Sequence, residues 1–127
     1  MAASKLRVFV MDDEVDFLAT IAEVLALAGH DVETAPSVDG AGSKIRGGAF
    51  DVVMLDHRVD GLDSQSLLDE LAAWSAAPST ILCSGGPSIA AIADRYDIYS
   101  LRKPFDLDDF LGLIERAAAH PRRPSKV

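Results

Sequence analysis

Three aspartates follow two apolar segments of the chain, and their placement suggests chemistry that needs a cation. Asp12 and Asp13 come directly after the run 6–11, and Asp56 ends the run 50–56. Short apolar runs of this kind are typical of buried parallel strands, whose carboxyl ends carry the active sites of open α/β sheets. If the two strands are neighbours, three carboxylates converge, and each pair costs roughly 4 kcal/mol at an effective dielectric of about 20. A compensating cation is therefore expected.

The residue types near these acids predict which cation and which reaction. Mg²⁺ suits an all-oxygen, partly hydrated site that combines one or two carboxylates with phosphate oxygens. Lys103 offers an ammonium that could pair with Asp56 or hold a phosphate oxygen, and Ser84 offers a hydroxyl donor. Nothing in the sequence resembles a serine–histidine pair. The natural nucleophile is therefore a carboxylate, which can form an acyl phosphate.

The elements that must position these groups alternate between strand and helix along the chain. Strands are predicted at 5–11, 31–35, 51–55, 80–83 and 98–101, and helices at 14–28, 38–46, 64–74, 88–95 and from Asp106 onward. This alternation predicts an α/β fold of the doubly wound (βα)5 type, with a five-stranded parallel sheet in the flavodoxin-like order 2-1-3-4-5. In that order the candidate site residues lie at or just after strand ends along one edge of the sheet.

Several other side chains are predicted to serve packing or to lie at the surface. The predicted buried stripe of the last helix consists of Phe110, Leu111, Ile114 and Ala118. Cys83 is predicted to be an inert thiol inside a strand. His30 is predicted to lie at the surface, and His57 is predicted to be a partly exposed loop residue beside Asp56.

Length, charge and cysteine content narrow the classes of function. The 127 residues suggest one domain, expected over 1–120, with the basic, proline-interrupted residues 121–127 as a tail or the start of a linker. The net charge of −8 argues against direct binding of nucleic acid. A single cysteine permits no intramolecular disulfide and fits a reducing, cytoplasmic setting. No segment has the pattern of a signal peptide or a membrane span.

Taken together, residues 6–119 resemble the receiver domain of two-component response regulators, the CheY-like family. The matching signature is Asp12-Asp13, then Asp56 after its apolar run, then Ser84, then Lys103-Pro104-Phe105. The resemblance implies that Asp56 accepts a phosphoryl group from a histidine kinase or a phosphotransfer protein in a Mg²⁺-dependent reaction. Contacts with an unidentified downstream protein or domain would then change.

The same resemblance implies a role for each site residue. Asp13 and Asp56 would bind Mg²⁺ directly, together with the backbone carbonyl of Arg58, and Asp12 would act mostly through a bound water. Ser84 and Lys103 would hold the phosphoryl oxygens and sense the phosphorylated state.

Some positions depart from the family pattern. Asp60 stands where proline is frequent, and Ser64 stands where glycine is frequent. Ser100 occupies a position that usually carries Tyr or Phe, whose ring turns inward on activation. Because neighbouring residues of a strand face opposite sides, Tyr99 is not expected to replace that ring. The segment 85–98 is short, so the helix expected there is short or irregular.

Three alternatives stay open at this point. The chain could be a pseudo-receiver that keeps the fold as an interaction module. It could be an aspartate-nucleophile phosphatase, although that class usually has a second acid two residues after the nucleophile, where this chain has Arg58. It could also be a flavodoxin-like cofactor binder, although such a protein would want a glycine- and hydroxyl-rich loop where Asp12-Asp13-Glu14 stands.

Overall fold

The centre of the molecule is a parallel five-stranded sheet. The computed structural model describes residues 5–59 and 62–121. The strand order β2-β1-β3-β6-β7 corresponds to 2-1-3-4-5 when the sheet strands are counted along the chain, which confirms the predicted fold class. The strands are β1 (Arg7–Met11), β2 (Asp31–Ala35), β3 (Val52–Asp56), β6 (Ser79–Ser84) and β7 (Tyr99–Arg102).

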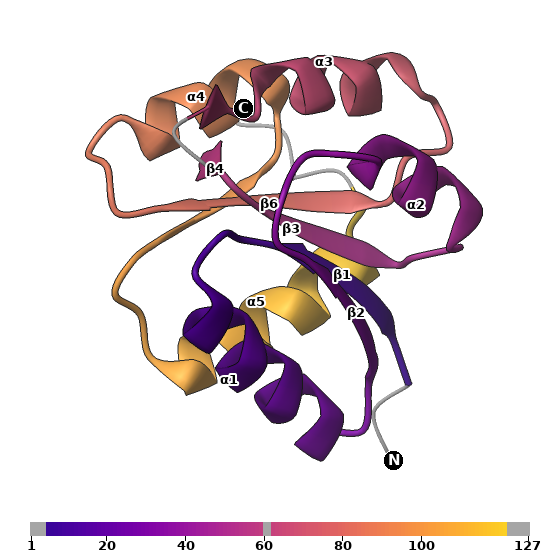
Figure 1. Cartoon of the computed structure of the whole chain (residues 1–127), viewed down its shortest axis with the longest axis vertical. Coiled ribbons are helices and arrows are strands. Elements are labelled where there is room, and N and C mark those ends of the chain that lie inside the picture. The colour runs from indigo at the N-terminus through magenta and orange to yellow at the C-terminus, as the bar shows by residue number, and fades with distance from the viewer. Residues whose placement is uncertain (1–4, 60–61, 122–127) are drawn as a thin grey trace.

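Helices cover both faces of this sheet, as Figure 1 shows. Two helices, α1 and α5, lie on one face, and the other three lie on the opposite face. The helices are α1 (Val15–Leu27), α2 (Ala41–Gly47), α3 (Gln65–Ala73), α4 (Ile89–Tyr96) and α5 (Leu107–Ala119). None of the helices in the described ranges combines the length and the apolar character that crossing a bilayer requires.

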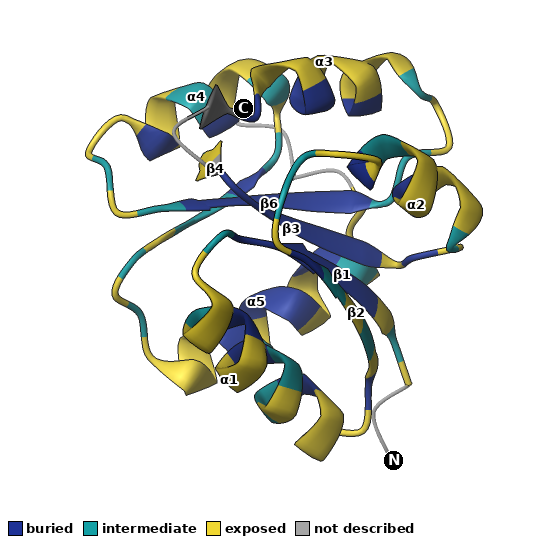
Figure 2. Cartoon of the chain, viewed as in Figure 1, coloured by how far each residue is buried: buried dark blue, intermediate teal, exposed yellow. Residues whose placement is uncertain are grey.

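The alternation of strand side chains divides the core into two layers. In β1, Val8 and Val10 pack with the α1–α5 layer, whereas Phe9 and Met11 pack with the layer under α2, α3 and α4. β3 is buried along its whole length, and Figure 2 shows it inside the molecule. A strand that is buried on both faces needs a nearly continuous apolar run, which is why its sequence was recognisable.

Two helices differ from the sequence prediction. α2 begins at Ala41 rather than near residue 38, because Gly40 has a φ of 71°, a left-handed conformation that no helix can include. In α5 the buried side chains are Phe110, Leu113, Ile114 and Ala117, whereas Leu111 and Ala118 are only partly buried. The observed set follows the i, i+3, i+4, i+7 spacing of one helix face, which the predicted stripe did not keep.

The prediction for His30 was wrong, because this side chain is buried at the junction of α1 and β2. Only 7% of its surface is exposed, and its Nδ1 accepts a hydrogen bond of 3.1 Å from the backbone N–H of Leu6. Gly29, at a φ of 94°, ends α1 just before it and turns the chain into β2. His30 therefore helps to tie the first strand to the end of the first helix.

The connection from β3 to α3 contains a small antiparallel ladder that the sequence did not predict. It pairs β4 (Arg58–Val59) with β5 (Leu62–Asp63). The predicted turn pair Asp60-Gly61 lies outside the described residues. The N–H of Ser64 donates to the carbonyl of His57 at 2.8 Å, which closes the base of this connection next to Asp56. Ser64 is buried, and its Oγ has no hydrogen-bond partner among the described residues.

Tyr99 and Ser100 face opposite sides of β7, in agreement with the prediction that Tyr99 does not replace an aromatic residue at position 100. Tyr99 is buried in the α1–α5 layer, and its hydroxyl donates to the carbonyl of His120 at 2.8 Å. α4 on the other face is short but regular, with eight residues. Tyr99 is thus an anchor for the end of α5.

The Tyr99→Phe variant is therefore expected to lose about 1 kcal/mol of unfolding free energy, because it removes one partly buried hydrogen bond and leaves the ring in place. Urea denaturation followed by circular dichroism measures this loss. Tyr96→Phe is the control, since the Tyr96 hydroxyl bonds Asp69 at an exposed site and should contribute little. Equal stability of Tyr99→Phe and wild type would contradict the anchoring role of the Tyr99 hydroxyl.

Candidate functional site

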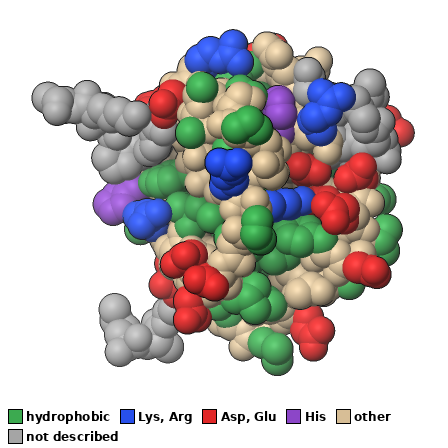
Figure 3. Space-filling model, turned by 90° about the vertical axis from the view of Figure 1, so that its left-hand side faces the viewer, with side chains coloured by type: hydrophobic (Ala, Val, Ile, Leu, Met, Phe, Trp, Pro, Cys, Tyr) green, Lys and Arg blue, Asp and Glu red, His purple; other side chains and the backbone are tan. Residues whose placement is uncertain are grey.

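Three carboxylates meet at the edge of the sheet where the strands end. Asp12 follows β1 and Asp56 ends β3, and these two strands pair in parallel with Met11 opposite Leu55. Ligand oxygens of Asp12, Asp13 and Asp56 all lie within 4.8 Å of one another. Asp12 is 1% exposed and Asp56 is 8% exposed. Figure 3 looks at the side of the molecule where the sheet strands end, and it shows acidic side chains gathered beside a basic one.

Backbone contacts fix the position of Asp12. Its N–H donates to the carbonyl of Ala35, the last residue of β2, at 3.1 Å. Its Oδ1 accepts a hydrogen bond of 2.9 Å from the N–H of Glu14, which precedes the first turn of α1. One carboxylate oxygen of Asp12 is therefore engaged in shaping the β1–α1 loop, and the other oxygen remains for a cation.

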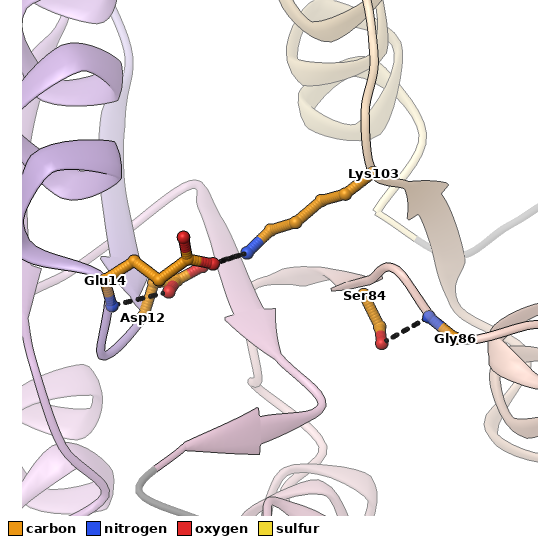
Figure 4. A network of polar contacts seen from close by, with 5 residues as sticks. All are labelled: Asp12, Glu14, Ser84, Gly86 and Lys103. Carbon is orange, nitrogen blue, oxygen red and sulfur yellow. Dashed lines mark hydrogen bonds and ion pairs between the residues drawn. The ribbon is translucent and has the colours of Figure 1, made fainter.

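That cation is the ammonium of Lys103, which reaches the acids from the loop after β7. Its Nζ donates to Asp12 Oδ2 at 2.6 Å and to Glu14 Oε1 at 3.3 Å, as Figure 4 shows. The same Nζ lies 4.3 Å from the centroid of the Phe17 ring. The backbone of Lys103 is held by its N–H, which donates to the carbonyl of Ser84 at 2.9 Å, and the Lys103–Pro104 peptide is cis.

The sequence suggested Asp56 as a possible partner of Lys103, but the direct contacts are to Asp12 and Glu14. The positive charge of Lys103 acts on Asp56 electrostatically, in the direction that lowers the pKa of its carboxyl group. Glu14 and Phe17 were missed as members of the site. Their signals in the sequence are weak: Glu14 is the third consecutive acid after β1, and Phe17 follows it by three residues, nearly one helical turn.

Burial and like charges raise the pKa of Asp56 to about 6. Loss of hydration is the largest cause, and the charge of Asp12 adds to it. The charge of Lys103 acts in the opposite direction, as does a hydrogen bond between the carboxylate and the backbone of Arg58. Asp56 therefore has a reduced tendency to carry its charge until a further cation is present.

Lys103 remains charged in this environment. Burial lowers its pKa, but the hydrogen bond to Asp12 and the negative charges of Asp56 and Asp12 outweigh that influence and raise the pKa to about 12. Cys83 lies one residue before Ser84 in β6, and burial raises the pKa of its thiol to about 12, so it stays protonated. The prediction of an inert strand cysteine is consistent with its burial.

Ser84 is the last residue of β6 and lies at the same edge of the sheet as the acids. Its Oγ accepts a hydrogen bond of 3.0 Å from the N–H of Gly86, also drawn in Figure 4. Because the hydroxyl acts there as an acceptor, its proton is free to donate to another oxygen. The five predicted side chains of the site, Asp12, Asp13, Asp56, Ser84 and Lys103, thus come from the ends of β1, β3, β6 and β7.

The donor set fits a hard divalent cation. Carboxylate oxygens from three aspartates lie close enough together to bind one ion. An oxygen-only set of this kind is typical of Mg²⁺ or Ca²⁺ rather than of zinc.

His57, the neighbour of Asp56, is partly exposed as predicted, and its Nδ1 is buried without a hydrogen-bond partner.

Comparison with known proteins gives a consistent result. A family model described as the response regulator receiver domain matches residues 8–115. The transcriptional regulatory protein TcrA of Mycobacterium tuberculosis is 31% identical over 96% of this chain and 51% of its own length. The transcriptional regulatory protein ZraR of Salmonella typhimurium is 27% identical over 96% of this chain and 28% of its own length. The chain thus spans about half or less of the length of these relatives.

Solved structures agree with the fold. NtrX from Brucella abortus in complex with ATP superposes with a TM-score of 0.81 at 33% identity, over 95% of this chain and 28% of that one. A CheY-like receiver domain protein from Methanospirillum hungatei superposes with a TM-score of 0.83 at 20% identity, over 93% of this chain and 97% of that one. The second match supports the fold alone.

Proposed function

Because the chain belongs to the response regulator receiver family, we propose that Asp56 is its phosphoacceptor and that phosphorylation of Asp56 switches contacts with another protein or domain. The observation that carries this proposal is the convergence of Asp12, Asp13, Asp56 and Lys103 at one sheet edge. A buried carboxylate beside a cation site and a fixed ammonium is suited to attack a phosphorus atom and to stabilise the charge that develops on its oxygens.

The roles of the individual residues follow from their chemistry. An Oδ of Asp56 forms the bond to phosphorus, and the bond from phosphorus to the donor breaks. Lys103 supplies a point charge and Ser84 supplies a hydroxyl donor to the phosphoryl oxygens. A divalent cation, expected to be Mg²⁺, would be held by Asp13, Asp56 and the backbone carbonyl of Arg58, with Asp12 acting mostly through water. When bound, it supplies neutralisation of charge on the acids and the phosphoryl oxygens.

The partners follow from the reaction. Receiver domains interact with kinases and with downstream effectors, so the donor is a histidine kinase or a phosphotransfer protein. The relatives TcrA and ZraR are named as transcriptional regulators. We place the receiver domain at residues 1–120 and treat 121–127 as a tail or the start of a linker. The acidic charge of this chain, −8, favours protein contacts over direct contact with nucleic acid.

The phosphoacceptor role separates experimentally from the alternatives. Incubation with Mg²⁺ and acetyl phosphate is expected to add the mass of one phosphoryl group to the intact protein, measured by mass spectrometry. The Asp56→Asn variant should gain none, and EDTA should abolish the gain in wild type. The Asp16→Asn variant, which removes an exposed acid from the first turn of α1, is the matched control and should be modified like wild type.

Two of the alternatives, the phosphatase and the pseudo-receiver, have their own outcomes in that experiment. A phosphatase would release many equivalents of inorganic phosphate from acetyl phosphate for each protein molecule, whereas a receiver releases phosphate only as its acyl phosphate hydrolyses. A pseudo-receiver would show neither modification nor release. Equal modification of wild type and Asp56→Asn would reject Asp56 as the acceptor.

A further inference from the structure

We propose that Glu14 is a positioning residue that, together with Phe17, holds the Lys103 ammonium in a resting place and opposes its engagement with a phosphoryl group on Asp56. This inference rests on the phosphoacceptor role proposed above and deepens it. Glu14 and Phe17 lie outside the acid cluster, and neither residue belongs to the predicted signature.

The geometry shows a complete resting place for the ammonium. Two of the groups around Nζ are oxygens, Asp12 Oδ2 at 2.6 Å and Glu14 Oε1 at 3.3 Å. The third is the face of the Phe17 ring, whose centroid lies 4.3 Å away. A lysine ammonium has three protons to donate, and here two carboxylates and an aromatic face surround it. All three groups come from the short segment 12–17, so they act as one cradle.

This cradle competes with the role expected of Lys103. A phosphoryl group would be attached to Asp56, at the end of β3, whereas the contacts of the ammonium lie on the β1–α1 side. To hold a phosphoryl oxygen, Nζ must give up part of this cradle. Any interaction that exists only in the resting arrangement shifts the equilibrium away from the phosphoryl-bound one by its own free energy.

Glu14, rather than Asp12, is the informative member of the cradle. Asp12 belongs to the acid cluster, so a bound divalent cation shares its charge and weakens its hold on Lys103. Glu14 is not in that cluster, and it precedes α1 without a side-chain capping bond. Its attraction for Lys103 therefore persists when the cation site is filled. Phe17 is also outside the acid cluster, but its ring packs edge-on against Phe105 in the loop after Lys103, so Glu14 is the sharper position for a test.

The size of the effect is limited by exposure. The Glu14 side chain is 66% exposed, so its ion pair with Lys103 is partly screened by water. Exposed pairs of this kind change equilibria by a factor of about five at most. Glu14 thus adjusts the affinity for a phosphoryl group without deciding whether the reaction occurs.

Beryllofluoride, a mimic of a phosphoryl group on a carboxylate, provides the test. Its affinity is measured by ¹⁹F NMR titration at saturating Mg²⁺, and the Mg²⁺ affinity is measured separately by calorimetry so that the two effects are not confused. Glu14→Gln is expected to bind beryllofluoride about two- to fivefold more tightly than wild type. Phe17→Leu should shift in the same direction, and Asp16→Asn, which removes a charge from the same turn, should not change.

A spectroscopic measurement on the resting protein tests the contact itself. In ¹⁵N-labelled protein without Mg²⁺, the Lys103 ammonium should give a resolved signal that broadens in Glu14→Gln through faster exchange with water, and Asp16→Asn should leave it unchanged. Unaltered beryllofluoride affinity in Glu14→Gln, with normal binding by wild type, would overturn the role of Glu14 alone. Absence of beryllofluoride binding by wild type would instead overturn the phosphoacceptor role itself.

Discussion

The metal-free Asp56→Asn variant is expected to unfold at a temperature about 10 °C higher than wild type at pH 8. Folding buries the Asp56 carboxylate beside Asp12 and raises its pKa from 3.8 to about 6. At a pH above both values, ionised Asp56 therefore lowers the free energy of unfolding by about 3 kcal/mol. Asparagine has the same shape and no charge, so it removes this penalty. A difference of that size corresponds to about 10 °C in a domain of this length.

The pH dependence gives this prediction a sign that can be checked. Between pH 3.8 and about 6 the unfolded chain releases the Asp56 proton while the folded protein keeps it, so wild type loses stability as the pH rises through this window. The gap between the variant and wild type should thus be small near pH 4 and reach its full size above about pH 7. Differential scanning calorimetry in EDTA measures it.

Two controls separate this effect from a general loss of negative charge. Glu23→Gln removes an exposed charge from α1 and should change the unfolding temperature little. Adding Mg²⁺ should stabilise wild type and narrow the gap, because a cation that binds the folded state compensates the carboxylates. A variant less stable than wild type at pH 8 in EDTA would contradict the charge repulsion described here.

Removing Lys103 is expected to have the opposite effect. The Lys103→Met variant keeps most of the side-chain volume but leaves Asp12, whose side chain is 2% exposed, without its 2.6 Å ion pair. Breaking a buried pair by removing one partner leaves an uncompensated charge, which costs about 3 kcal/mol. Urea denaturation at pH 7.5 in EDTA should show this loss, and saturating Mg²⁺ should recover part of it.

The exposed Lys44 on α2 offers the matched control, since Lys44→Met removes the same charge from a residue outside the site. The double variant Lys103→Met/Asp56→Asn makes the experiment stricter. It should be more stable than the sum of the single changes, because removal of Asp56 lessens the repulsion that Lys103 no longer balances. Strict additivity of the two changes would mean that the lysine and the acid cluster are not electrostatically coupled.

The backbone framework of the site was predictable from the sequence, whereas its resting arrangement was not. Asp12 and Asp56 follow apolar runs, and parallel strands bring their carboxyl ends to one edge, so their proximity follows from topology. The contacts of Lys103 depend on the rotamers of a long side chain that several acids attract. No local pattern states that Glu14 and Phe17, rather than Asp56, receive its ammonium.

The same contrast holds for the elements. Strand β3 was recognisable because a strand buried on both faces must be apolar throughout. The start of α2 was missed because the left-handed conformation of Gly40 is a property of one residue within a plausible helical stretch. The β4–β5 ladder was missed because pairs of two residues leave no periodic signal.

The short strand β7 connects the site with the C-terminal end of the last helix, α5. Lys103 follows its carboxyl end, and Tyr99 at its first position is bonded to the carbonyl of His120, where α5 ends. Four residues of strand span about 13 Å. Because an extended strand hardly stretches, a displacement of β7 along its own axis would move Lys103 and the Tyr99 anchor of the C-terminal end of α5 together.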